Sequence, residues 1–271
     1  AVATEAYLHT ARLRTSVRRH ARLVDYRLHE GCNARVWVHV QTSMDFAETL
    51  QPGELRFDTG PDARQPDGRL LATNSAPTAL GEVFEPLLGP EAQTIHLYHA
   101  HNEIHFYTWG DTLCCLPRGA TSATLIDDRQ HYSASVEQAD VLRDEEDEES
   151  EEQGAHDDRR LLQLQKGDYL LFEEVIGPRT GKPADADPTR RHIVRLTQVE
   201  KGFDALYDVP VLEIAWAKED GLPFPLCIST LDTPEHDCRR LENVSVARGN
   251  MILADHGRTL KIENLGAVPL V

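Results

Sequence analysis

The sequence predicts a mainly β (α+β) protein with antiparallel sandwich-like or barrel-like domains and a short helical segment at the N-terminus. From Asn33 onward, short runs alternate between apolar and polar residues, with a period of two that is typical of strands. Turn-forming Gly, Pro, Asn and Asp residues separate these runs. Before Asn33, apolar residues instead recur every three or four positions, which is typical of helix.

The N-terminal segment predicts two short helices. The stretch 4–13 has helical spacing behind a cap at Thr4, and the stretch 16–26 has an apolar face with arginines opposite it. The apolar face of the second stretch comprises Val17, Ala21 and Val24. Gly31 ends the helical signal.

The clearest strand prediction is the stretch 191–200, where apolar and polar residues alternate strictly. A second long β-type run covers 161–176. The connection 177–183 is rich in Gly and Pro, so the two runs are expected to be antiparallel neighbours.

Shorter strands are predicted along the rest of the chain. They cover 34–41, 54–58, 81–88, 93–98, 209–216, 223–229, 244–247, 251–254 and 259–263, and Cys114 and Cys115 lie inside a further apolar strand. The separators 248–250 and 255–258 both have the composition of tight hairpin turns.

Charge is unevenly distributed along the chain. The net charge is −17, from 45 acidic and 28 basic residues, and the segment 144–158 alone supplies ten carboxylates with no Lys or Arg. Without that segment the balance is 35 acidic against 28 basic residues, or −7. The segment is expected to be a solvated or disordered loop, and no nucleic-acid or anionic-membrane partner is indicated.

The domain organisation follows from these patterns. We predict a helical lead-in at 1–32, a first β domain at 33–128, an acidic loop at 129–159 and a second β domain at 160–271, which can pack with the first as one unit. The sequence has no run of eighteen apolar residues and no signal-peptide pattern, so membrane insertion is not expected.

The five cysteines do not suggest a disulfide framework. Their number is odd, they include no CxxC pair, and they comprise Cys32, Cys114, Cys115, Cys227 and Cys238. A reducing compartment is therefore expected.

A histidine cluster invites a metal hypothesis. Four histidines fall within ten residues: His96, His99, His101 and His105. Neutral imidazoles on one strand face bind zinc, but Asn102 interrupts the strand and no HExxH or CxxC spacing is present. We predict no metal, no cofactor and no catalytic residues, and keep a zinc-dependent hydrolase using the His96–His105 cluster as an alternative.

Other chemical readings are weaker. Cys115 or Ser122 with a His and an Asp could form a nucleophilic triad, but no GxSxG elbow is present. Asp255 and His256 could form an acid and base pair, although the Gly that follows them favours a turn.

The tryptophans support a third class of function. Trp37, Trp109 and Trp216 could stack on a carbohydrate or peptide in a β-sandwich ligand-binding module. The simpler interpretation is core packing, because each lies in or next to an apolar strand.

Several longer phrases resemble a known family. They are residues 16–26, 102–111, 115–121, 177–181 and 246–257. They are similar to the baseplate assembly proteins of phage-tail-like contractile injection systems, within the broad baseplate J-like group. The similarity runs in order from about Tyr7 to Pro269, and family members are much longer, so the chain is expected to be a middle fragment.

The resemblance implies a structural role. A protein of this family is a baseplate wedge component that surrounds the hub and helps to trigger sheath contraction. The implied partners are other wedge proteins, hub, spike and sheath proteins, and copies of itself. The implied location is the cytoplasm, in a phage-tail-like particle, and no catalytic residues carry over.

Overall fold

The computed structural model describes residues 4–29, 31–51, 53–59, 81–88, 93–136, 159–233 and 238–259. Within these ranges the chain is mainly β, its sheets are antiparallel and helices are few, which confirms the predicted fold class. The acidic tract 144–158 and most of the predicted strand 259–263 lie outside the described residues.

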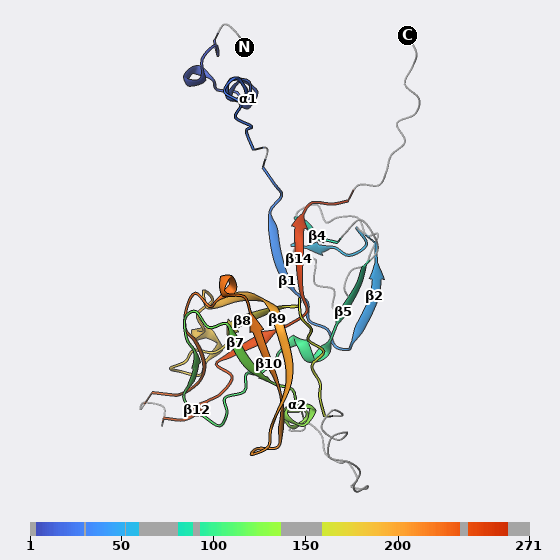
Figure 1. Ribbon diagram of the computed structural model, residues 1–271, viewed down its shortest axis with the longest axis vertical. Coiled ribbons are helices and arrows are strands. Elements are labelled where there is room, and N and C mark those ends of the chain that lie inside the picture. Colours follow the sequence, from blue (N-terminus) through green and yellow to red (C-terminus); the bar gives the residue numbers. More distant parts are fainter. Residues whose placement is uncertain are drawn as a thin grey trace.

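The larger part of the body is a half-barrel (Figure 1). Its five-stranded sheet has the order β13-β8-β9-β10-β7 and is flanked by a three-stranded sheet of order β12-β11-β6. The strands are β6 Cys114–Leu116, β7 Ser122–Ile126, β8 Tyr169–Glu174, β9 Arg191–Asp204, β10 Val209–Trp216, β11 Leu226–Leu231, β12 Arg240–Leu241 and β13 Ser245–Arg248.

The predicted pairing of 161–176 with 191–200 is confirmed for its second half. Strand β8 pairs with β9 from Tyr169 opposite Arg195 to Glu173 opposite Arg191. Residues 161–168 are not a strand, although Leu162 and Leu164 are buried. The first amides of this segment bond to a side chain instead of a neighbouring strand, since those of Leu161 and Leu162 donate to Asp127 Oδ1 at 2.8 and 2.7 Å.

Aromatic contacts fill the centre of the half-barrel. Phe172 is fully buried and meets Phe106 and Trp216 edge-on, with ring centroids 5.1 and 5.2 Å apart. Buried aliphatic side chains from every central strand surround them, including Leu125, Val194, Leu196 and Ile214. This arrangement places Val194 and Leu196, which share one face of β9, in the core.

A second, smaller unit lies beyond one end of the half-barrel. Its four-stranded sheet has the order β1-β14-β4-β3, and a separate pair joins β2 to β5. The strands are β1 Arg35–His39, β2 Phe46–Leu50, β3 Phe57–Asp58, β4 Val83–Pro86, β5 Gln93–Leu97 and β14 Met251–His256. Strands from the predicted 33–128 and 160–271 regions therefore pair with each other in both units, as β7 with β10 and β1 with β14.

The hairpin predicted at 248–250 is wrong. Strand β13 pairs with β8, whereas β14 pairs with β1 and β4, so residues 248–250 carry the chain from one unit to the other. Hairpin turns and sheet crossovers both favour Gly and Asn, and distant contacts decide between them here. The hairpin predicted at 255–258 would lead into a strand that lies mostly outside the described residues.

Helices differ in detail from the prediction. Helix α1 covers Arg14–Leu23, which overlaps the predicted 16–26 region but begins two residues earlier and ends three residues earlier. The stretch 4–13 contains only the 3-10 turn η1 Leu8–Thr10, because Glu5 Oε1 accepts from the amides of Arg12 and Leu13 at 3.0 and 3.1 Å and folds this segment into a turn.

One helix was missed by the sequence reasoning. Helix α2 covers Arg129–Val136, inside the predicted acidic loop. The carboxylate of Asp128 accepts from the amide of Gln130 at 3.0 Å, which satisfies a helix-start donor. Three further 3-10 turns are η3 His99–Asn102, η4 Pro183–Asp185 and η5 Lys218–Asp220.

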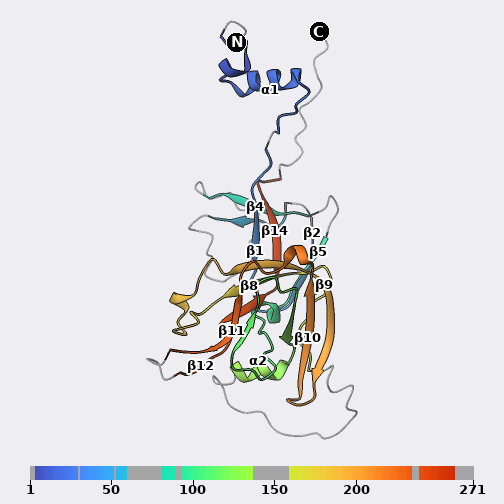
Figure 2. The ribbon, with the colours of Figure 1, turned by 60° about the vertical axis from the view of Figure 1, so that its left-hand side comes forward.

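Helix α1 and the β9–β10 turn mark opposite ends of the molecule. In Figures 1 and 2, α1 stands away from both units, while the β9–β10 turn and α2 lie at the far end of the half-barrel. None of the helices in the described part of the chain has the length and apolarity needed to cross a membrane.

Candidate functional site

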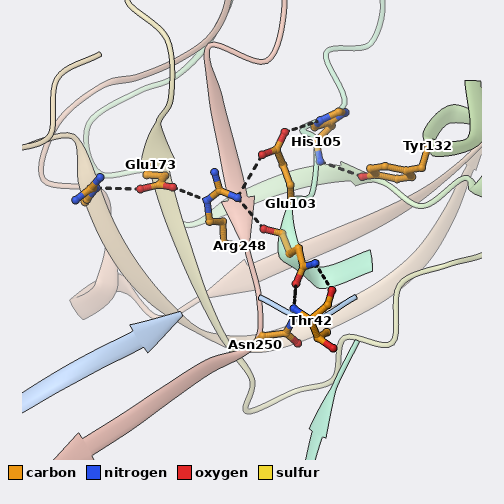
Figure 3. A network of polar contacts seen from close by, with 9 residues as sticks. Thr42, Glu103, His105, Tyr132, Glu173, Arg248 and Asn250 are labelled. Carbon is orange, nitrogen blue, oxygen red and sulfur yellow. Dashed lines mark hydrogen bonds and ion pairs between the residues drawn. The ribbon is translucent and has the colours of Figure 1, made fainter. Parts of the chain in front are cut away.

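The two units meet where β13 ends and β14 begins, and we call this region the joint. It comprises Asn102, Glu173, Arg248, Gly249 and Asn250. Figure 3 shows Glu173, Arg248 and Asn250. These residues come from three distant parts of the chain. The distinctive Ala-Arg-Gly-Asn phrase of the resemblance lies at its centre.

Arg248 connects both units through its guanidinium group. Its Nε atom donates to Glu173 Oε1, and its Nη1 atom donates to the carbonyl of Asn102 at 2.8 Å. Glu173 also pairs with Arg191 at 2.9 Å. The side chains of Arg248 and Glu173 are only 14% and 12% exposed, so this ion pair is largely shielded from water.

Asn250 and Asn102 replace backbone pairing where the sheets diverge. The Asn250 side chain accepts from the amide of Tyr98 at 3.0 Å and donates to the carbonyl of the same residue at 2.9 Å. Asn102 bonds the amide and carbonyl of Thr42 in the same two-sided way, at 3.0 and 2.7 Å. Asn250 adopts φ 51°, a left-handed conformation that Asn tolerates better than most residues.

His101 is a structural residue of the joint. Its side chain is buried, and its Nε2 atom accepts from the amide of Gln163 at 3.1 Å. Burial lowers the pKa of His101 to about 4, so the imidazole is neutral at pH 7. A cleft of about 600 Å³ opens beside it, lined in part by Trp37, Tyr98 and Tyr169.

His105 joins the joint from the half-barrel side through Glu103, which also pairs with Arg248 at 3.2 Å. Its Nδ1 atom lies 3.0 Å from His131 Nε2, and its Nε2 atom lies 3.4 Å from Glu103 Oε1. The hydrogen bond from His105, together with the nearby Arg248, lowers the pKa of the Glu103 carboxyl. The Tyr132 hydroxyl accepts from the His105 amide at 3.0 Å, which ties α2 to this group.

The predicted histidine cluster is thus divided. His96 and His99 are exposed, His101 is buried in the joint, and His105 faces α2. Turn η3 causes this division, because it redirects the chain at His99 instead of extending a strand. Within the described residues, no group of three or more His, Cys, Asp or Glu side chains is placed to hold a metal ion.

The other chemical candidates are also separated. Asp255 and His256 are adjacent in β14, so their side chains point to opposite faces, and His256 pairs with Glu82 at 2.8 Å. Cys115 and Ser122 are both exposed, on strands β6 and β7. All five cysteines are free thiols, and burial raises the pKa of Cys227 to about 11.

The three tryptophans have three different environments. Trp216 is buried in the core, and Trp37 packs against Tyr169 with ring centroids 4.6 Å apart. Trp109 is 52% exposed. Only Trp109 among them therefore presents a largely open surface.

Two exposed apolar surfaces complete the candidate site. The arm is residues 4–26, which contain η1 and α1. The tip is the loop 107–113 together with the β9–β10 turn and its flanks, residues 203–208. The loop and the turn are in contact, because Tyr107 Oη donates to Asp204 at 2.6 Å and the Tyr207 hydroxyl lies over Gly110. Sequence reasoning noted the helical spacing of the arm, but exposure depends on tertiary structure.

Comparison with known proteins gives no relative. No family model matches the chain, and neither a curated protein nor a solved structure matches it significantly. The fold and the site define an antiparallel, mainly β protein with two units, a buried polar joint and two exposed apolar surfaces.

Proposed function

We propose that this protein is a structural component of a phage-tail-like contractile injection system, a baseplate wedge protein that acts through contacts with other subunits. The proposal starts from the family resemblance. Its phrase 16–26 falls on the arm, and its phrase 246–257 falls on the joint. Neither phrase surrounds a set of catalytic groups.

The observation that carries the proposal is the exposure of the arm. Its large apolar side chains Tyr7, Leu8, Leu13, Leu23, Val24 and Tyr26 are between 57% and 83% exposed. Burial of apolar surface contributes roughly 25 cal/mol per Å², so a surface of this kind is stabilised by a partner. In an assembly, neighbouring subunits cover such a surface permanently.

The joint supports the same role mechanically. A buried Arg248–Glu173 pair and two side-chain clamps hold the units in one arrangement. Two titratable side chains lie beside the cleft. His101 Nε2 accepts a hydrogen bond from the amide of Gln163 at 3.1 Å, and Asp168 Oδ2 accepts one from the amide of Gln165 at 2.8 Å. These contacts favour a rigid connector, because a catalytic acid or base needs a free position facing its substrate.

The test is assembly of the particle. The genes surrounding this one should encode sheath, tube, spike and an AAA-type ATPase, and particles purified after expression of that gene cluster should contain this protein. Deletion of its gene should leave unattached tubes and no contractile particles, and a copy supplied in trans should restore them. Complete, contractile particles in the deletion strain would refute the proposal.

A further inference from the structure

We propose that the arm of one copy docks onto the tip of a second copy, so that copies of this chain associate head to tail. The inference rests on the proposed assembly function and names the arm's partner. Four observations carry it: the distribution of exposed apolar side chains, the charges of the two surfaces, the rigidity of the tip and the positions of both surfaces.

Exposed apolar side chains concentrate on these two surfaces. Fifteen large hydrophobic side chains are exposed among the described residues, six of them on the arm and five on the tip. The five on the tip are Trp109, Leu113, Phe203, Leu206 and Tyr207. The most exposed side chain of the arm is Leu23 at 83%, and that of the tip is Leu206 at 81%. Association of the two would remove both from water.

The charges of the two surfaces are opposite. The arm, residues 4–26, contains five arginines and two acidic residues, a net charge of +3. The tip, residues 107–113 and 203–208, contains three acidic residues and no Lys or Arg, a net charge of −3. Opposite charges at two apolar surfaces speed the encounter and exclude arm-to-arm pairing, where arginines would repel.

The tip is rigid before any partner arrives. The hydrogen bond from Tyr107 fixes Asp204 and lowers the pKa of its carboxyl, and the edge of Trp109 meets Tyr107 with ring centroids 5.1 Å apart. Gly110 has φ +81°, and a Cβ there would lie 2.8 Å from the Tyr207 hydroxyl. A surface that is already ordered loses little conformational entropy on binding.

The positions of the two surfaces determine the symmetry. The arm and the tip lie at opposite ends of the molecule (Figures 1 and 2). A contact between different surfaces of two identical chains is heterologous, so association continues until a ring closes or a filament forms.

Association is measured by sedimentation velocity over a range of protein concentrations. The intact chain should form oligomers that grow with concentration at low salt and weaken as the Debye length falls from about 10 Å at 0.1 M to about 3 Å at 1 M ionic strength. An intact chain that stays monomeric under all these conditions overturns the inference.

Three matched substitutions locate the interface. Leu23→Gln alters the arm and Leu206→Gln alters the tip, and each should weaken association about tenfold or more. Met44→Gln is the control, because Met44 is 69% exposed and lies on neither surface. Circular dichroism checks that all three variants fold.

Mixing the two variants tests the head-to-tail arrangement. The Leu23→Gln chain keeps an intact tip and the Leu206→Gln chain keeps an intact arm, so a mixture should form 1:1 dimers that cannot grow further. Unchanged association of either single variant overturns the inference. So does a mixture that remains monomeric while the intact chain associates.

Failure here is distinguishable from failure of the proposed function. If the intact chain is monomeric but purified particles still contain it and lose it on Leu23→Gln substitution, the arm binds a different subunit. The assembly role then stands, and the head-to-tail contact is refuted.

Discussion

Gly249 and His101 are in direct contact at the joint, where a Cβ at position 249 would lie 2.8 Å from the Cβ of His101. The Gly249 amide also donates to the His101 carbonyl at 2.8 Å. The two units can approach this closely only because residue 249 has no side chain.

Gly249→Ala should therefore destabilise the protein. The added methyl group must displace the backbone of η3 or of the crossover, and overpacking of this kind costs about 1–3 kcal/mol of unfolding free energy. Urea denaturation followed by tryptophan fluorescence measures the change. Met44→Ala, at an exposed position, is the control and should stay within about 0.5 kcal/mol of the parent. An equal effect of both variants would contradict the contact.

Arg248→Met should lower the free energy of unfolding by about 2–4 kcal/mol. The substitution keeps much of the aliphatic volume but leaves the shielded Glu173 carboxylate with Arg191 as its remaining charged partner. Arg240→Met is the matched control, because Arg240 and its partner Glu242 are 42% and 59% exposed. Exposed ion pairs contribute about 0–1 kcal/mol, so the control should change little. Denaturation midpoints of the two variants that coincide would contradict the structural role of Arg248.

The stability of the protein should fall below pH 6.5 because of His101. Its pKa in the folded protein is about 4, against an ordinary value of 6.5, so between these values the unfolded chain binds a proton and the folded chain does not. The contribution of neutral His101 to the free energy of unfolding is present above pH 6.5 and is lost as the pH falls. Between pH 6.5 and pH 5 the loss is about 2 kcal/mol.

Comparison of variants isolates this contribution. The difference in unfolding free energy between pH 7.5 and pH 5 should be smaller in His101→Gln than in the parent. His99→Gln removes an exposed histidine nearby and should leave the difference unchanged. A His101→Gln chain with the parent's pH dependence would show that His101 is protonated equally in both states.

Zinc content distinguishes the hydrolase alternative from the structural one. We expect purified protein to carry no stoichiometric zinc after dialysis, since His96 and His99 are exposed and His101 Nε2 is occupied by a backbone amide. Elemental analysis measures the content. One zinc per chain, lost in the His99→Ala and His101→Ala double variant, would move the hydrolase alternative to first place.

The sequence was sufficient to predict strands in which one face of the sheet is buried. In strand β9 the buried residues Val194 and Leu196 lie two positions apart because one face packs on the core, and this period of two was sufficient to locate the strand. In the run 161–168, Leu162 and Leu164 are buried with the same period of two, but residues 161–163 pair with no strand, because their amides bond to Asp127 and His101. The alternation of apolar residues indicates which side chains are buried, but it does not indicate which groups accept hydrogen bonds from the backbone amides.

The joint could not be predicted from local sequence. The phrase Arg248-Gly249-Asn250 has the composition of a hairpin turn, and its role as a crossover is decided by Glu173, Asn102 and Tyr98. These partners are 75 to 152 residues distant along the chain. The exposure of the arm is equally non-local, because amphipathic spacing predicts an apolar face without saying whether the same chain covers it.

Removal of the acidic tract should leave the folded body intact. Residues 144–158 supply ten carboxylates and no Lys or Arg, and an unpaired buried charge costs several kcal/mol, so the tract is expected to remain in water and to add nothing to the core. Replacing 144–158 with a short Gly-Ser linker should therefore shift the thermal midpoint by less than about 5 °C, which corresponds to roughly 2 kcal/mol for a chain of this size. A larger drop, measured by differential scanning calorimetry, would show that the tract packs against the body.

The same deletion should reduce salt-sensitive association, because the described residues that flank 137–158 include Arg159, which bonds Asp208 at the tip at 2.9 Å. Loss of ten negative charges weakens the long-range attraction between the acidic chain and an arginine-rich arm, so the association rate should fall most strongly at low ionic strength.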